Sequence, residues 1–190
     1  MLHTVEMDTS VTEDFEIPPD IYNTLSKVSD LSKKSKPCCL VKAEKTAAKK
    51  LGIKLQTLSS DCSDLFDQTL VNLYEKLFTI NRSQLTSTKI GNCEQGAVIA
   101  NQDYSKQEPI FLFGVTTKKT NLATVSSTKK NEILLGPLRT ANTSKICNAK
   151  YLKINNFQNI FICVATKPII QNSQILINYE PGKGNRFWVR

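Results

Sequence analysis

Histidine is almost absent from this sequence, since His3 is its only imidazole. Serine and cysteine nucleophiles of the triad type need a positioned imidazole base, so the sequence excludes Ser-His-Asp and Cys-His catalysis. No apolar run reaches the ~20 residues of a membrane span. Residues 1–16 are acidic and lack the basic and apolar regions of a signal peptide. We therefore expect a nuclear or cytoplasmic protein that stays in a reducing compartment.

The cysteines offer no metal-binding pattern. There is no C-x-x-C pair, and the six cysteines are scattered: Cys38, Cys39, Cys62, Cys93, Cys147 and Cys163. A structural zinc site usually draws four Cys or His ligands at short spacings. We therefore predict thiols that are mostly buried, and no metal site.

Charge is unevenly distributed along the chain, whose net charge is +8. Residues 1–30 carry seven acidic side chains and one lysine, a net of −6, whereas residues 31–60 carry eight lysines and one glutamate, a net of +7. The basic run is typical of a solvated face. Two sharper interpretations stay open: a nuclear-import patch at Lys33, Lys34 and Lys36, or contact with an acidic partner such as nucleic acid or chromatin.

The first 80 residues contain three helical patterns. Pro18 and Pro19 are suited to the first turn of a short helix. Residues 40–51, rich in Lys and Ala, predict a basic helix closed by Gly52. The strongest pattern is residues 61–80, where the spacing i, i+4, i+7, i+11 predicts one apolar face made of Phe66, Leu70, Leu73 and Leu77.

These patterns suggest a division of the N-terminal half. We expect residues 1–60 to be a charged, partly disordered or helical segment, with residues 1–36 poorly ordered or loosely docked. Residues 61–87 are expected to form the amphipathic helix that docks on the domain that follows.

From about residue 88 the pattern changes to short apolar or alternating runs separated by turn residues. The runs are 96–100, 109–115, 132–135, 150–154, 160–166 and 175–179. Residues 88–190 are therefore predicted to form a mainly β domain, which makes the chain α+β overall.

Three segments of this domain carry recognisable motifs, and the region that they span is about half the chain. The first has Gly96 to Ala100, then Asp103-Tyr104 and Lys106-Gln107-Glu108. The second has Gly136, Arg139, Ala141, Asn142, Ser144 and Asn148, and the third has Ala165, Ile169, a turn, Asn178 and Tyr179. In order and approximate spacing, these segments resemble the SET family of protein-lysine methyltransferases.

Several positions depart from the family pattern. Gln107 replaces a turn glycine, and Asn172-Ser173-Gln174 replace Gly-Glu-Glu. Asparagine tolerates positive φ better than most residues, so Asn172 is suited to the glycine's position. The remaining replacements are Thr143 for His, Lys145 for Cys, Cys147 for Pro and Asn178 for Asp.

The resemblance implies a β-rich SET-like fold with a knot-like crossing, and S-adenosylmethionine as the cofactor. It implies cofactor binding by Gly96, Ala97, Arg139, Asn142, Thr143 and Trp188, with Asn142 and Thr143 holding the adenine. Phe187 and Trp188 would form a lid, since the zinc-binding tail of some family members is missing. Tyr179 matches the catalytic tyrosine, which positions the lysine amine. Purely structural roles stay open for Asn142, as a turn cap, and for Tyr179, as a core residue.

Three functions remain in competition. The first is methyl transfer to lysine side chains of a protein substrate, with a basic histone tail as one candidate. The second is a catalytically inactive SET-like binding module in a chromatin or regulatory complex. The third is an unrelated basic β-protein that binds nucleic acid through residues 31–60. That segment contains no aromatic residue, which argues against stacking on single strands but leaves phosphate contact open.

Overall fold

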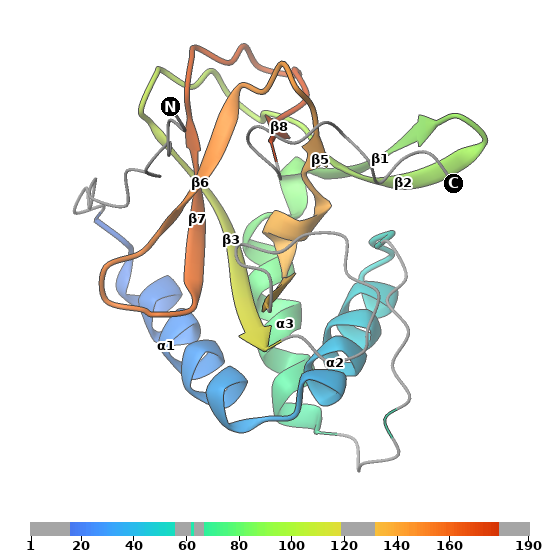
Figure 1. Cartoon of the computed structure of the whole chain (residues 1–190), viewed down its shortest axis with the longest axis vertical. Helices are drawn as coiled ribbons and strands as arrows, with labels where there is room; N and C mark the ends of the chain where they lie inside the picture. The colour runs from blue at the N-terminus through green and yellow to red at the C-terminus, as the bar shows by residue number, and fades with distance from the viewer. Residues whose placement is uncertain (1–15, 56–61, 63–66, 119–131, 179–190) are drawn as a thin grey trace, which may run out of the picture.

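The computed structural model describes residues 16–55, 62, 67–118 and 132–178. In these ranges, three helices lead into a six-stranded mixed sheet and a separate two-stranded hairpin (Figure 1). The predicted order, a helical segment followed by a mainly β domain, is confirmed.

The first two helices each begin at a proline: α1 spans Pro19–Lys34 and α2 spans Pro37–Lys50. A proline is tolerated there because the first N–H groups of a helix have no intrahelical partner. Gly52 ends α2 with a φ of +68°, and the N–H of Ile53 donates to the carbonyl of Ala48 at 2.9 Å. This is a Schellman motif, so the prediction that Gly52 closes the helix is confirmed.

Helix α1 is docked on the core, and the expected loose docking of residues 1–36 is therefore wrong for this helix. Leu25 and Val28 are fully buried in one apolar cluster with residues of α2, α3 and the sheet. The Ser29 hydroxyl donates to Asn159 Oδ1 at 2.6 Å and so joins α1 to the β-rich half. Residues 1–15 lie outside the described residues.

Helix α3 spans Gln68–Ile80 and is shorter than the helix predicted over residues 61–80. The side chain of Asp67 accepts hydrogen bonds from the N–H groups of Thr69 and Leu70, at 2.9 and 3.4 Å. It is the N-cap that fixes the start of the helix. The predicted apolar face is confirmed for the buried Leu70, Leu73 and Leu77, whereas Phe66 lies outside the described residues.

The six-stranded sheet has the order β4-β3-β7-β6-β8-β5. Strands β3, β4, β6 and β7 pair antiparallel, and β8 pairs parallel with both β6 and β5. A short 3-10 helix, η2 (Pro137–Thr140), precedes β5. The strands are β3 (Pro109–Lys118), β4 (Glu132–Leu135), β5 (Asn142–Thr143), β6 (Ala149–Lys153), β7 (Ile160–Ala165) and β8 (Leu176–Ile177).

A separate hairpin consists of β1 (Leu85–Ile90) and β2 (Cys93–Val98), and it projects from the body of the molecule (Figure 1). Each of the six predicted apolar runs overlaps a strand. Strand β1 was not predicted, because its sequence LTSTKI is too polar to stand out from a loop.

The sheet is covered on both faces at its centre. In β3, Phe113 and Val115 belong to the apolar cluster shared with the helices, whereas Ile110 and Leu112 belong to a second cluster with the residues that precede β8. Since successive side chains of a strand point to opposite faces, β3 separates the two clusters. The near-continuous apolar sequence of β3 follows from this double burial.

Two non-glycine residues of the described chain have positive φ: Gln107 at 70° and Asn172 at 68°. Both occupy positions where the motif comparison has a turn glycine. The left-handed conformation favours glycine, and asparagine more readily than most other residues. The interpretation of Asn172 as a substitute for glycine is confirmed, and the turn at Gln107 keeps the same backbone conformation.

This conformation makes Gln107→Gly a stabilising change. The left-handed backbone costs a residue such as glutamine ~1–2 kcal/mol, and the extra chain entropy of glycine offsets part of the gain. We expect a net gain of ~1 kcal/mol and a thermal midpoint higher by ~2–4 °C, measured by circular dichroism. Gln102→Gly is the control, because Gln102 is exposed and lacks positive φ. An unchanged or lower midpoint for Gln107→Gly would contradict the argument.

Candidate functional site

The first and third motif segments lie against one another. The N–H of Ala100 donates to the carbonyl of Ser173 at 2.9 Å, and the N–H of Asn172 donates back to Ala100 at 2.8 Å. Tyr104 and Ile169 exchange backbone hydrogen bonds of 2.8 and 2.9 Å. The segment that follows the β1–β2 hairpin is thus fixed to the segment that precedes β8.

The second and third segments also meet, where the knot-like crossing was expected. Strand β5 runs parallel to β8, with Thr143 opposite Ile177. The side-chain amide of Asn148 donates to the carbonyl of Gln174 at 2.9 Å and accepts from the N–H of Leu176 at 2.8 Å. Asn148 therefore satisfies two backbone groups of the neighbouring segment and has a structural role that the motif did not reveal.

Asn142 links the first and second segments. Its Oδ1 accepts a hydrogen bond from Gln95 Nε2 at 2.7 Å. Its Nδ2 is buried and has no hydrogen-bond partner among the residues that the structure describes. A buried donor in this state costs ~1–3 kcal/mol unless a bound molecule accepts its hydrogen bond. The Nδ2 of Asn142 is therefore a donor that could form a hydrogen bond to a bound ligand.

Gly96 and Ala97 lie on β2, next to this contact. Both are buried, and a Cβ on Gly96 would lie 2.5 Å from the carbonyl oxygen of Lys54 and 3.5 Å from the side chain of Thr140. Glycine is needed at position 96 for this close packing. A hydrogen bond from the Lys54 ammonium to Glu94 holds the same strand and lowers the pKa of Glu94.

Arg139 faces a buried carboxylate on α2. Its Nη2 donates to Glu44 Oε2 at 2.9 Å, its Nε donates to Glu44 Oε1 at 3.3 Å, and the N–H of Gly136 donates to the same Oε1 at 2.6 Å. The two side chains are 6% and 0% exposed. This pair joins α2 to the turn that leads into β5.

Glu44 was not among the residues predicted from the sequence, although a signal is present. It is the only acidic residue of the basic stretch 31–60, and it stands one helical turn from both Leu40 and Ala47, which are fully buried. An acidic side chain on the apolar face of a helix needs a buried cationic partner.

Tyr74 lies fully buried beside this pair. Burial raises the pKa of its hydroxyl well above the ordinary value, the Glu44 carboxylate raises it further, and the Arg139 guanidinium opposes both. The nearby Ser32 hydroxyl also lowers this pKa, although neither hydroxyl makes a hydrogen bond of good geometry to a described residue. Tyr74 is therefore a neutral part of this polar cluster at ordinary pH.

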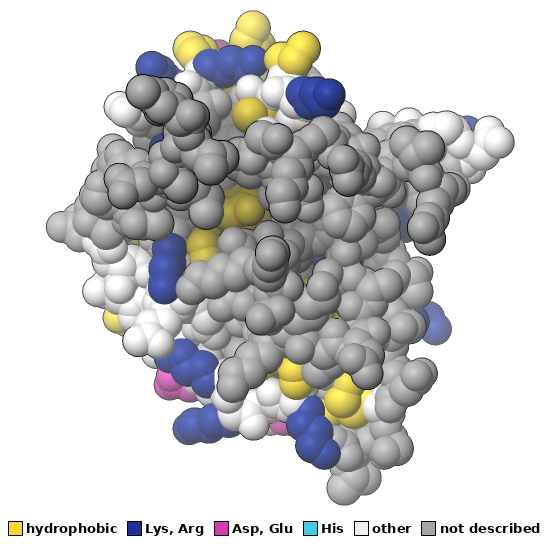
Figure 2. Space-filling view, viewed as in Figure 1, with side chains coloured by type: hydrophobic (Ala, Val, Ile, Leu, Met, Phe, Trp, Pro, Cys, Tyr) yellow, Lys and Arg dark blue, Asp and Glu magenta, His cyan; other side chains and the backbone are white. Residues whose placement is uncertain are grey.

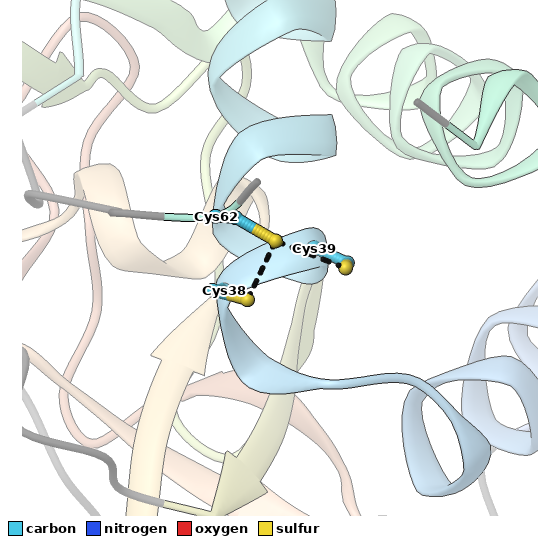
Figure 3. Close-up of side chains that lie close together, drawn as sticks. All are labelled: Cys38, Cys39 and Cys62. Carbon is cyan, nitrogen blue, oxygen red and sulfur yellow. Dashed lines mark hydrogen bonds between the residues drawn. The ribbon is translucent and has the colours of Figure 1, made fainter. Parts of the chain in front are cut away.

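The cysteines differ in part from the prediction. In the structure Cys38, Cys39 and Cys62 are neither scattered nor mostly buried, whereas the predicted lack of a metal site stays a prediction. These three are half-buried, and the Cys62 sulfur lies 2.7 Å from that of Cys38 and 3.3 Å from that of Cys39 (Figure 3). The long sequence separation concealed this cluster.

The predicted catalytic and lid residues stay predictions. Tyr179, Phe187 and Trp188 lie outside the described residues, which end at Asn178, directly after β8.

The lysines of the basic segment are largely exposed. Figure 2 shows Lys and Arg side chains over α1 and the start of α2, with few acidic ones among them. The exposed lysines of residues 31–50 are Lys33, Lys34, Lys36, Lys45, Lys49 and Lys50. None of the described helices combines the length and apolar character needed to cross a membrane.

Comparisons with known proteins give similarity in structure only. No family model and no curated protein matches the sequence. The structure is similar to a candidate histone methyltransferase of Plasmodium falciparum, with a TM-score of 0.38 and 22% identity over 53% of this chain and 98% of the other. It is similar to the methyltransferase domain of human PR domain-containing protein 2, with a TM-score of 0.41 and 15% identity over 67% and 98%. For the SET domain of the RIZ1 tumor suppressor, the TM-score is 0.34 and the identity 17% over 57% and 77%.

TM-scores as low as these carry no argument about activity. What indicates a function is the set of contacts within this chain, above all those that join the three motif segments.

The buried ion pair makes Glu44→Gln strongly destabilising. The amide can still accept a hydrogen bond, but the Arg139 guanidinium loses its counter-charge, so the free energy of unfolding should fall by ~3–5 kcal/mol. Chemical denaturation measures this change. The control is Glu75→Gln, whose partner Lys50 lies 2.7 Å away at a partly exposed position, and we expect a loss below ~1 kcal/mol. Equal losses for the two variants would show that the buried pair has no special role.

Proposed function

We propose that this chain binds S-adenosylmethionine and transfers its methyl group to lysine side chains of a protein substrate. The observation that supports the proposal most is the Nδ2 of Asn142, which lacks a hydrogen-bond partner within the described ranges and stands where the family resemblance has its adenine-binding asparagine. Gln95 already occupies the acceptor side of this amide. The donor side is left for a ring nitrogen of the adenine.

The neighbouring residues fit this cofactor. The pairing of β5 with β8 fixes the backbone of Asn142 and of Thr143, the threonine that replaces the family's histidine. Gly96 packs closely on the Lys54 carbonyl and on Thr140, and this packing holds β2 beside Asn142. We propose that Arg139 acts as a positioning residue, which holds the approach to β5 through Glu44.

The chemistry places a specific demand on the protein. S-adenosylmethionine supplies an electrophilic methyl group on a sulfonium, which a neutral amine can accept by in-line displacement. A free lysine is protonated at neutral pH, with a pKa near ~10.4, so the channel must favour the uncharged amine by excluding water. We propose that Tyr179 orients this amine through its hydroxyl, and that Trp188 covers the cofactor.

One observation favours the second candidate, an inactive SET-like binding module. The turn at Asn172, Ser173 and Gln174 keeps its backbone bonds to the first segment without the acidic side chains of the family pattern. The fold is therefore kept without those acids. Their replacement fits a chain that has lost catalysis and kept the fold. Contact of residues 31–60 with an acidic partner or nucleic acid stays a prediction under either function.

Calorimetric titration with S-adenosylmethionine tests the binding step. We expect at least micromolar affinity and a loss of about ten- to a hundredfold in Asn142→Ala, which removes the amide partner of the adenine. Asn155→Ala is the control, since Asn155 is an exposed asparagine away from the motif segments, and it should bind as the wild type does. The absence of detectable heat at high protein concentration would end the enzyme hypothesis.

Radiolabelled methyl transfer to a mixture of basic proteins that includes histones tests the catalytic step. Tyr179→Phe should lower turnover by at least about tenfold with little change in cofactor affinity, because it removes one positioned hydroxyl and keeps the ring. Trp188→Ala should instead weaken cofactor binding. A wild type that binds the cofactor but labels no protein would favour the binding module. Wild-type turnover in Tyr179→Phe would refute the role of Tyr179.

A further inference from the structure

Three cysteine sulfurs converge at the start of α2. Cys38 and Cys39 are the second and third residues of this helix, and Cys62 belongs to the connection between α2 and α3. Figure 3 shows the Cys62 sulfur reaching both neighbours. All three sulfur atoms lie within 4.8 Å of one another.

The three sulfurs are close enough to reach one shared centre, and the contacts of 2.7 and 3.3 Å would lengthen around an ion. An ion with bonds of ~2.3 Å to sulfur separates two of its ligands by at most ~4.6 Å, and by ~3.8 Å in a tetrahedron. The contact of 2.7 Å between Cys38 and Cys62 is longer than the ~2.05 Å of a disulfide. A disulfide would also use only two of the three sulfurs, whereas Cys62 lies close to both of the others.

The electrostatic setting favours a cation among the thiolates. The first turn of a helix carries partial positive charge, which stabilises a thiolate. Three adjacent thiolates repel one another, and a bound cation compensates this repulsion and displaces their protons.

We propose that Cys38, Cys39 and Cys62 form a three-thiolate site for one thiophilic d10 cation, Zn²⁺ or Cu⁺. Sulfur-only donors select soft ions of this kind over Mg²⁺, Ca²⁺ or Mn²⁺. Three thiolates satisfy Cu⁺, and Zn²⁺ takes a solvent molecule as its fourth ligand. The site is separate from the proposed cofactor site and does not depend on that function.

Such an ion ties the start of α2 to the connection that precedes α3. Cys38 and Cys62 are 24 positions apart, so the ion closes a loop that the unfolded chain leaves open. Because a preformed site is lost on unfolding, the ion stabilises the folded protein by mass action.

The test uses the full chain, reduced and freed of metal with a chelator. It is titrated with Zn²⁺ and, without oxygen, with Cu⁺, each against a chromophoric competitor. We expect one equivalent of at least one ion to bind and to raise the thermal midpoint by several degrees. Cys38→Ser, Cys39→Ser and Cys62→Ser should each weaken binding by about a hundredfold or more. Cobalt substitution should show sulfur-to-metal charge-transfer bands that these variants lose.

The matched control is Cys147→Ser, a half-buried cysteine outside the cluster, which should bind the ion as the wild type does. Circular dichroism confirms that each variant is folded. The proposal is overturned if neither ion binds the reduced protein, or if Cys147→Ser weakens binding as much as the cluster variants. It is also overturned if the protein binds neither ion and mass spectrometry finds a disulfide at Cys62, because the cluster is then a redox pair.

Discussion

The buried ion pair of Glu44 and Arg139 is the contact on which the arrangement of this molecule depends. A carboxylate with no exposure to water is tolerated only when nearly all of its hydrogen-bonding capacity is used, and Glu44 accepts from the Arg139 side chain and from the backbone of Gly136. Such a pair contributes little net stability compared with apolar residues, but each partner is costly to leave alone. It therefore selects the position of α2 relative to the turn before β5.

The consequences extend to both sides of Asn142. Glu44 holds the chain just before β5, and the segment that leaves α2 places the Lys54 carbonyl against Gly96 on β2. The hydrogen bond from Gln95 to Asn142 then joins β2 directly to β5. Helix α2 and the segment that follows it thus support both β5, which carries Asn142, and β2, which contacts it. A site held in this way keeps its geometry before any ligand arrives, which lowers the entropy cost of binding.

Local patterns were predictable from the sequence, whereas contacts between residues far apart in the sequence were not. Gly52 closed its helix, and Asn172 adopted the turn conformation expected of it, because each acts through its own backbone. The start of α3 was placed too early, since the acidic residues before it look alike in the sequence and local spacing does not show that Asp67 makes the capping bonds. The partner of Glu44 and the two backbone bonds of Asn148 could not be read from local spacing, because both join segments that meet only in the folded chain.

Helix α2 also connects the sulfur cluster to the candidate cofactor site. Cys38 and Cys39 stand in its first turn, and Glu44 stands between one and two turns later on the same helix. An ion at the cluster would suppress fraying of the helix start, and any effect on Asn142 would have to pass through Glu44 and the turn that it holds. Linkage requires that such a coupling act in both directions, so a ligand at Asn142 would then tighten the ion by the same factor. If the helix is already rigid at Glu44, the two sites are independent. Coupling needs a second conformation of the helix whose population a ligand can shift.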